Sequence, residues 1–348
     1  MKITQHSYPC SKGEIRLFRL ENSRGAWVEL SSLGAGITGV GVPDSKGVIE
    51  NVALCYETPD LYLGDGPNMG KCPGRYANRI GHGRIEVGGK KYQLNCNLPP
   101  HHLHGGADGL QNQLWDAEVL EDGVRFSVTS PDGHENYPGN LKVTATYRWN
   151  DDMELSLEFE AESDAETVIN LTNHAYWNLR GATAGTALDH ELKMKASRYL
   201  ETDHTLLPTG VSIPTSGNPM DFSEFKTIRC DINADFEPLK IGKGYDHCWV
   251  IDEWVPGRMS EEVVVIREPQ SRRTLTIDSD QPGVQIYSGN WLTGSPKGPG
   301  GFEYSDYDGL AVEMQGFPDA PNRPEFPSQT LIPGKPYKRL INFKFGTY

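Results

Sequence analysis

A stretch of strict alternation between apolar and charged or polar residues constrains the fold of this chain more than any other feature. From Met153 to Glu160 every second residue is apolar, and the residues between are Glu or Ser. Successive side chains of a strand point to opposite sides of a sheet, so this period suits a strand with one face in a core and one in water. The stretch therefore predicts a half-buried antiparallel strand.

Further segments have the composition and the boundaries of strands, and most end at Gly, Pro, Asp or Asn. They are residues 123–130, 141–149, 262–267, 274–278 and 339–345. No segment longer than about three turns carries the apolar stripe of a helix, so we expect only a few short, peripheral helices. The sequence thus predicts an all-β protein of packed antiparallel sheets, with residues 1–348 in a single domain.

Charge and cysteine content limit the possible partners and compartment. Lys and Arg total 33 against 47 for Asp and Glu, and the net charge of −14 repels nucleic acid and anionic membrane surfaces. The first residues lack an apolar leader, and no stretch approaches the roughly twenty apolar residues of a membrane span. The six cysteines include no Cys-x-x-Cys pair, which favours reduced thiols. We expect a cytoplasmic protein, monomeric or a weak homodimer, with no nucleic-acid or membrane partner.

The segment Val168–Asn178 is the most informative about function. If it forms one strand, one of its faces is mainly apolar and the other is polar. A merely solvated face more often carries Lys and Glu than His, Tyr and Asn, so the pattern favours a ligand-binding face. The residues on that face are Asn170, Thr172, His174, Tyr176 and Asn178.

Glu313 stands in a short apolar run, between Val312 and Met314. Partial burial there would raise the pKa of its carboxyl group toward neutrality, which suits a general base. The alternative is a glutamate that faces outward from an edge strand.

Two pairs of shorter segments carry further hydrogen-bonding groups. Residues 74–81 and 103–106 combine Arg75, Asn78, Arg79 and His104 with glycines that let the backbone approach a ligand. When each segment is considered alone, surface cations and a capped loop histidine are the favoured explanation of the arginines and His104. Residues 245–249 and 284–287 place a carboxylate and an amide among apolar residues, and such groups bind vicinal sugar hydroxyls. The alternatives are an Asp satisfied by backbone amides and an amide that points to solvent.

The histidines of residues 101–104 raise the question of a metal site, because His102 and His104 would share a strand face. However, Pro99 and Pro100 indicate an irregular loop, and the motif contains no acidic residue to complete a ligand shell. We therefore predict no metal site.

Six motifs, taken in chain order, resemble the motif series of the aldose 1-epimerase (galactose mutarotase) family. They lie at residues 74–80, 103–106, 173–179, 245–249, 285–290 and 312–315, and similar opening and closing segments extend the resemblance over nearly the whole chain. The resemblance implies a large antiparallel β-sandwich of the galactose-mutarotase type with an open cleft on one sheet. It also implies an isomerase of hexose metabolism that interconverts the α and β anomers of free aldoses without a cofactor.

The resemblance also implies roles for individual residues. By motif position Glu313 is the general base and His174 the general acid, with His104 beside them as a second catalytic histidine. The acidity of the chain favours a protonated His174. Two departures from the family pattern, Lys71-Cys72-Pro73 and Trp177, bear on the cleft edge. The residues expected to hold the sugar are Asn78, Arg79, His104, His174, Tyr176, Asp246 and Gln285.

Three rival functions fit the sequence less well. A hexose-6-phosphate 1-epimerase needs additional basic residues for the phosphate, and no such cluster accompanies the motifs. A non-catalytic sugar-binding module would lack the acid or the base, whereas His174 and Glu313 are both present. A glycoside hydrolase needs two carboxyl groups across a cleft, for which Asp246 and Glu313 are candidates. The preferred aldose is not determined by the sequence.

Overall fold

Nearly all the regular structure of the chain is β-strand. The computed structural model describes residues 1–348. The segments 153–160, 123–130, 141–149, 262–267, 274–278 and 339–345, which were predicted as strands, are confirmed as strands. The most regular of them, β13 (Glu154–Ser163), alternates between buried and more exposed positions along most of its length. The prediction of few, short helices is also confirmed. They are α1 (Glu237–Gly242) and the 3₁₀ helices η1 (Pro59–Tyr62), η2 (Gly81–Gly83), η3 (Leu110–Asn112), η4 (His134–Asn136), η5 (Ile228–Cys230), η6 (Pro299–Gly301) and η7 (Ala320–Asn322).

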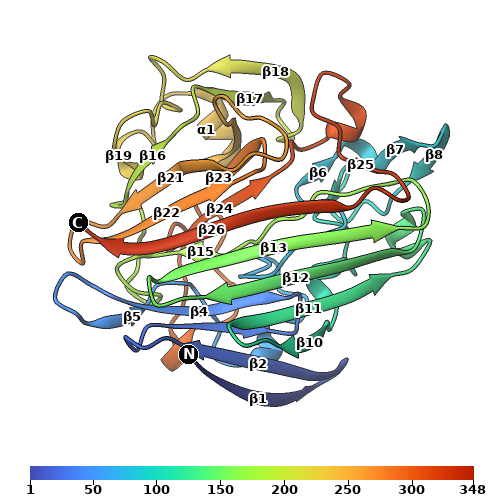
Figure 1. Cartoon of the computed structure of the whole chain (residues 1–348). Coiled ribbons are helices and arrows are strands. Elements are labelled where there is room, and N and C mark those ends of the chain that lie inside the picture. The colour runs from blue at the N-terminus through green and yellow to red at the C-terminus, as the bar shows by residue number, and fades with distance from the viewer.

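A nine-stranded antiparallel sheet forms the largest layer, and its long central strands cross the front of the view in Figure 1. Strands from the middle and the C-terminal part of the chain are neighbours in it. In sheet order the strands are β10 (Asp116–Val119), β11 (Gly123–Ser130), β12 (Leu141–Trp149), β13, β26 (Tyr337–Thr347), β22 (Arg273–Ser279), β21 (Ser260–Arg267), β16 (Glu191–Met194) and β19 (Lys226–Thr227).

A six-stranded antiparallel sheet forms a second layer. In order it contains β15 (Tyr176–Trp177), β24 (Leu310–Gln315), β23 (Gly283–Tyr287), β20 (Asp246–Val250), β17 (Arg198–Thr202) and β18 (Pro208–Pro214). The N-terminal strands form a five-stranded sheet, at the lower edge of Figure 1. These are β1 (Lys2–Cys10), β2 (Gly13–Glu21), β3 (Trp27–Ser31), β4 (Gly36–Pro43) and β5 (Ile49–Asn51).

Three short strand pairs complete the β-structure: β6 (Arg79–Ile80) with β9 (His102–Leu103), β7 (Arg84–Val87) with β8 (Lys90–Gln93), and β14 (Thr167–Val168) with β25 (Thr330–Leu331). No helix of the chain combines the length and the hydropathy that a membrane crossing requires. All six cysteines are free thiols.

The hydrophobic core lies between the sheets. Trp177 of the six-stranded sheet packs on Phe343 and Phe345 of β26, with ring centroids 5.5 Å apart in both pairs. Phe18 of β2 meets Phe126 of β11 edge to face at 5.7 Å. Such pairs contribute about 0.5–1.5 kcal/mol each beyond the area that they bury. The nine-stranded sheet thus supports both other sheets, as expected for the β-sandwich.

The six-stranded sheet has one core face and one polar face. Val312 and Met314 of β24 belong to the main core cluster, so Glu313 between them points to the opposite side. β24 lies between β15 and β23 and is not an edge strand. The prediction of a buried Glu313 is therefore confirmed, and the edge-strand alternative is wrong.

The prediction of one continuous strand over residues 168–178 is wrong. Only its two ends, in β14 and β15, are strands, and the residues between them follow an irregular path. The backbone there bonds to loops instead: the N–H of Asn170 donates to the carbonyl oxygen of Arg75, and the N–H of His174 donates to that of Lys71. The amide of Asn173 also donates to the carbonyl oxygen of Gly70. Asparagine side chains that bond to the backbone in this way compete with regular strand pairing.

Arg75 is a buried structural residue, so its interpretation as a surface cation is wrong. Its guanidinium donates to the hydroxyl of Ser130 and to the carbonyl oxygens of Ser130, Pro131, Pro138 and Gly139, at 2.8–2.9 Å. A buried guanidinium needs this many acceptors, because it carries five N–H donors and its charge has lost its water. Arg75 therefore ties the loop before β6 to the turn between β11 and β12.

Candidate active site

A cavity of about 550 Å³ opens over the polar face of the six-stranded sheet. Seven of the eight residues predicted for the site line it: Asn78, Arg79, His104, His174, Tyr176, Asp246 and Glu313. The eighth, Gln285, lies behind Asp246 and donates a hydrogen bond to it. The structure therefore brings all eight predicted residues together.

Strand register places four of these residues on the sheet. Gln285 of β23 is the register partner of Glu313 in β24, and Asp246 of β20 is the partner of Tyr287 at the end of β23. Tyr176 of β15 pairs with Ala311, two residues before Glu313. Since residues two apart share a face, the side chains of four neighbouring strands project into one cavity.

Arg79 belongs to the short pair β6–β9, in which it is opposite Leu103, and Asn78 and His104 directly flank these two strands. The N–H of His104 donates to the carbonyl oxygen of Asn78, and the N–H of Asn78 donates to Nδ1 of His104, both at 3.1 Å. Because Nδ1 accepts, a neutral His104 carries its proton on Nε2. Burial lowers the pKa of His104 well below its usual value. His104 is therefore a neutral hydrogen-bond donor toward the cavity.

His174 is held by its own backbone although it lies outside any strand. Its N–H donates to the carbonyl oxygen of Lys71 at 2.8 Å, and its carbonyl oxygen accepts from the N–H of Gly70 at 2.9 Å. Its ring lies 5.0 Å from that of Tyr176 and 5.3 Å from that of His104, centroid to centroid. These contacts fix the imidazole of His174 in the lining of the cavity.

His174 and Glu313 form a close, buried pair. Nε2 of His174 lies 3.5 Å from Oε1 of Glu313, and the two side chains are 7% and 2% exposed. Neither Nδ1 of His174 nor Oε2 of Glu313 has a partner in the protein. Burial therefore disfavours charge on both groups. It raises the pKa of Glu313 well above its usual range, as predicted, and lowers the pKa of His174 to about 4.

The expectation of a protonated His174 is wrong for the free site. That expectation relied on the net negative charge of the chain, but surface charges more than a Debye length of about 8–10 Å away are largely screened. Loss of water around the imidazole outweighs them. In the free protein the raised pKa of Glu313 and the lowered pKa of His174 therefore favour a neutral His174, with a proton that the pair shares on Glu313.

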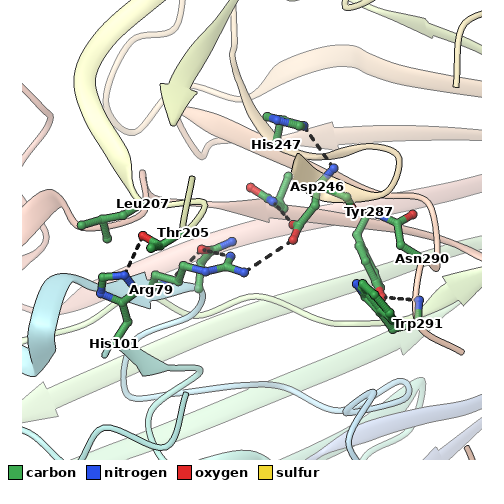
Figure 2. A network of polar contacts seen from close by, with 12 residues as sticks. Arg79, His101, Thr205, Leu207, Asp246, His247, Tyr287, Asn290 and Trp291 are labelled. Atoms are coloured by element: carbon green, nitrogen blue, oxygen red, sulfur yellow. Dashed lines mark hydrogen bonds and ion pairs between the residues drawn. The ribbon is translucent and has the colours of Figure 1, made fainter. Parts of the chain in front are cut away.

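Asp246 is fixed between two donors at the centre of the site (Figure 2). Nε2 of Gln285 donates to its Oδ1 at 2.6 Å, and its Oδ2 lies 3.6 Å from Nη2 of Arg79. Arg79 is itself held, since its N–H donates to Oδ1 of Asn78 at 2.8 Å. Each carboxylate oxygen keeps a free lone pair, so Asp246 can accept hydrogen bonds from hydroxyl groups of a ligand.

Comparison with known proteins agrees with this geometry. The family model described as aldose 1-epimerase matches residues 16–344. The chain belongs to the aldose 1-epimerase family. Among curated relatives, the galactose mutarotases of Mus musculus and Homo sapiens are 38% and 37% identical, each over 97% of this chain and 96% of their own. The aldose 1-epimerase of Escherichia coli K12 is 33% identical over 95% of both chains.

Two solved structures share the fold of this family member. A GalM/aldose epimerase homologue from C. elegans superposes with a TM-score of 0.86 at 30% identity, over 94% of this chain and 98% of its own. A galactose 1-epimerase from Lactobacillus acidophilus NCFM gives the same TM-score at 28% identity, over 99% of both chains. The prediction of a galactose-mutarotase type of β-sandwich is confirmed.

Sequence reasoning missed Tyr287 as a site residue. Tyr287 lines the cavity, with its ring centroid 6.0 Å from that of Tyr176 and 6.4 Å from that of His174. An aromatic face there suits the C–H side of a sugar ring. The signal was available, because Tyr287 follows Gln285 by two residues in a predicted strand and so shares its face.

Three members of the predicted polar face do not reach the cavity. Asn170 donates to the carbonyl oxygens of Ala77 and Gly316, and Asn178 donates to those of Gly185 and Asp308. Thr172 is fully buried. Since the segment is not one strand, its side chains do not share a face, and only His174 and Tyr176 line the cavity.

The neighbouring histidines His101 and His102 serve the fold. Nδ1 of His101 accepts from the N–H of His82 at 3.2 Å, and its Nε2 lies 2.8 Å from the hydroxyl of Thr205 (Figure 2). Nδ1 of His102 lies 2.6 Å from the carbonyl oxygen of Asn95, and its Nε2 2.7 Å from the hydroxyl of Tyr137. All four ring nitrogens are thus engaged in hydrogen bonds within the protein.

The family departures that were expected at the cleft edge are buried instead. Lys71, Cys72 and Trp177 are each at most 1% exposed. Nζ of Lys71 lies 2.5 Å from Oδ1 of the equally buried Asp65. This ion pair lies in the loop that carries Gly70 and Lys71, the backbone hydrogen-bond partners of His174. It therefore supports the position of His174 and does not form part of the cavity rim.

Proposed function

We propose that this chain is an aldose 1-epimerase, a mutarotase that interconverts the α and β anomers of free aldoses such as galactose and glucose. The observation that carries the proposal is the 3.5 Å approach of His174 to Glu313 within a cavity lined by hydroxyl-binding side chains. The curated relatives, which are named galactose mutarotase and aldose 1-epimerase, support it. In this account the protein is an isomerase of carbohydrate metabolism.

Mutarotation requires two proton transfers, one at each of the two oxygen atoms bonded to the anomeric carbon C1. A base takes the proton of the anomeric hydroxyl O1 while an acid protonates the ring oxygen O5, and the C1–O5 bond opens to give the free aldehyde. O1 and O5 are both bonded to C1, so the acid and the base have to be neighbours, as Glu313 and His174 are. Rotation about C1–C2 presents the other face of the carbonyl, and closure reverses both transfers.

The protons of the pair balance over this cycle. With Glu313 as base and His174 as acid, ring opening converts an ionised Glu313 and a protonated His174 into a neutral pair. Ring closure restores the charged pair. Both arrangements hold one proton in total, so no exchange with solvent is needed. The free site favours the neutral arrangement, and Arg79, which lowers the pKa of Glu313, favours the charged one. Burial, the larger effect, makes the neutral arrangement the lower in free energy, and Arg79 reduces the cost of reaching the charged one.

The remaining side chains hold and orient the sugar. Asp246 accepts hydrogen bonds from hydroxyl groups, and Gln285 keeps its carboxylate in place. Arg79, Nε2–H of His104 and the amide of Asn78 donate to hydroxyl oxygens. The rings of Tyr176 and Tyr287 contact the C–H face of the sugar. In this assignment His104 is the neutral donor beside the reacting atoms, and the proton-transfer steps belong to Glu313 and His174.

The three rival functions have less support. Arg79 is the one arginine or lysine that lines the cavity, and it is paired with Asp246, so the site offers little charge for a phosphate group. A binding module would not need the close acid–base pair. A hydrolase would need Asp246 as a second catalytic carboxylate, but the curated relatives are named galactose mutarotase and aldose 1-epimerase.

We also propose that residues 1–348 form a single domain that acts in the cytoplasm as a monomer or weak homodimer. The continuous core beneath all three large sheets supports one domain. Light scattering of the purified protein measures the oligomeric state.

Polarimetry tests the proposed reaction. Freshly dissolved α-D-galactose and α-D-glucose should reach anomeric equilibrium faster with the protein than without it. Glucose 6-phosphate and a nitrophenyl galactoside serve as controls for the rival activities. Preferred turnover of the phosphate ester, or release of nitrophenol, would replace this proposal by the corresponding rival.

A further inference from the structure

We propose that Asp319 is a positioning residue of the site, which holds the strand that carries Arg79 and so fixes how this arginine faces the sugar and Glu313. This inference rests on the proposed epimerase function. Asp319 lies six residues after Glu313, in the turn between β24 and η7. Its side chain is 3% exposed and does not line the cavity, so Asp319 acts through other residues.

The backbone of Arg79 is not held by the strand next to it. The N–H of His104 donates to the carbonyl oxygen of Asn78, so these two residues form a hydrogen-bonded pair at the end of β6 and β9. Bonded and non-bonded pairs alternate along an antiparallel ladder, which makes Arg79 and Leu103 a non-bonded pair. The carbonyl oxygen of Arg79 therefore points away from β9, to the other edge of β6.

Asp319 occupies that other edge in the manner of a neighbouring strand. Its N–H donates to the carbonyl oxygen of Arg79 at 2.8 Å, and its Oδ1 accepts from the N–H of Gly81, also at 2.8 Å. Residues two apart in a strand direct their backbone groups to the same edge. One residue thus satisfies both of the backbone groups that a further strand would otherwise bond.

Asp319 is itself firmly held. Its φ of 56° lies in the left-handed region, which Asp and Asn tolerate better than most residues because their side chains bond to the local backbone. Oδ1 also accepts from Nδ2 of Asn322 at 2.7 Å, and Oδ2 lies 3.3 Å from Nε of Arg323. The carboxylate therefore has a fixed orientation toward β6.

Tyr76 adds a second connection between the same two segments. Its hydroxyl donates to the carbonyl oxygen of Phe317 at 2.8 Å and accepts from the N–H of Ala320 at 3.2 Å. The turn that follows β24 is thus bonded to the chain before β6 as well as to β6. This turn fixes the strand of Arg79 relative to the strand of Glu313.

The guanidinium of Arg79 has few contacts of its own. Nη2 lies 3.6 Å from Oδ2 of Asp246 (Figure 2), Nη1 lies 3.4 Å from Oδ1 of Asn78, and Nε has no partner in the protein. The position of the backbone therefore determines where the guanidinium lies. Burial raises the pKa of Glu313, and the positive charge of Arg79 lowers it. A displaced β6 would change both a donor to the sugar and the pKa of Glu313.

The test removes the carboxylate without straining the backbone. Glycine adopts a positive φ at no steric cost, so Asp319→Gly loses only the side-chain bonds, whereas Asp319→Asn keeps an acceptor for the N–H of Gly81. In polarimetry with galactose, Asp319→Gly should raise KM by roughly three- to tenfold and leave kcat within about threefold, because Arg79 binds substrate and transition state alike. Asp319→Asn and the control Asp235→Gly, at a side chain that is 91% exposed, should keep KM within about twofold of wild type.

The pH profile of kcat/KM separates positioning from a general loss of stability. A displaced Arg79 no longer lowers the pKa of Glu313, so the alkaline limb should move to higher pH in Asp319→Gly. The acid limb, which reports on His174, should stay in place. Tyr76→Phe loosens the same turn by one hydroxyl group and should change KM and the alkaline limb in the same direction by less. The test therefore does not depend on the folding of Asp319→Gly.

Failure of this inference is distinguishable from failure of the proposed function. Folded Asp319→Gly or Tyr76→Phe protein with the KM and the alkaline limb of wild type would overturn the role of Asp319 alone. Equal losses in Asp319→Gly and Asp319→Asn would also overturn it, because the second variant keeps the bond to β6. A wild type that is inactive on every free aldose would overturn the epimerase itself.

Discussion

Nε2 of His174 lies 3.5 Å from Oε1 of Glu313, and both side chains are almost completely buried. The two residues are 139 positions apart in the chain, and different constraints hold them: strand pairing holds Glu313, and loop backbone contacts hold His174. A shared proton is the natural consequence, because burial penalises charge on either group unless the other carries the opposite charge. The pH dependence of the reaction follows from this relationship.

The first prediction concerns the pH profile of kcat/KM. The active pair carries one proton in total. On the acid side the rate should therefore fall as the pair takes up a second proton on the His174 imidazole, near the His174 pKa of about 4. On the alkaline side it should fall as Glu313 loses the shared proton, at its raised pKa. Asp246 raises the pKa of both groups, so Asp246→Asn should shift both limbs to lower pH. Unmoved limbs would contradict the assigned pair.

A second prediction concerns stability and Glu313. The folded pKa of Glu313 is raised, so its contribution to stability is fully present below the unfolded pKa of about 4.3 and is lost as pH rises toward the folded value. Glu313→Gln removes this loss. Urea unfolding should therefore show the variant gaining stability relative to wild type between pH 5 and pH 8. The exposed Glu121→Gln serves as the control and should show no such gain.

A third prediction concerns the buried histidines. Burial lowers the pKa values of His174, His190 and His247 to about 4. Their contribution is present above the unfolded pKa of about 6.5 and is lost as pH falls toward 4, at up to about 1.4 kcal/mol per pH unit for each group. His190 lies outside the site and accepts from the N–H of Leu179. His190→Gln should flatten the acid slope of the unfolding free energy, and the exposed His6→Gln should not.

The buried ion pair of Lys71 and Asp65 leads to a fourth prediction. Both side chains are at most 1% exposed, and Nζ of Lys71 also donates to the carbonyl oxygen of Tyr62 and to the amide oxygen of Asn112. Lys71→Met leaves the carboxylate buried without a counter-ion, which should cost about 3–5 kcal/mol of unfolding free energy. In urea unfolding, Asp65→Asn combined with Lys71→Met should cost less than the sum of the single changes. Additive losses would show that the pair is not coupled.

Local patterns predicted the strands because the information was local. In β13 the alternation of Leu155, Leu157 and Phe159 with polar residues determines which face is buried, whatever strand lies beside it. Segment 168–178 has a similar alternation, but its backbone bonds to loop residues such as Lys71 and Arg75. The local sequence of a segment does not indicate that its hydrogen-bond partners lie in a loop. Tertiary contacts therefore overrode the strand pattern there.

The sequence identified the residues of the site, but it did not predict how they are arranged in space. Glu313 and Gln285 are opposite each other only because β23 and β24 pair in one register, and the sequence shows neither the pairing nor its register. The protonation of His174 depends on burial by distant segments, which is why the net charge of the chain gave the wrong answer. Likewise, Arg75 is a structural cation because carbonyl groups more than fifty residues away surround it.

The central claim is that Glu313 and His174 transfer the protons of an anomerisation, and polarimetry of matched variants tests it most directly. The measurement follows the rotation of fresh α-D-galactose with wild type, Glu313→Gln, His174→Asn and the control Glu121→Gln. Loss of either proton-transfer group should lower kcat by about a hundredfold or more in a protein that remains folded, while the control keeps wild-type activity. Folded Glu313→Gln or His174→Asn protein with near wild-type turnover would contradict the account.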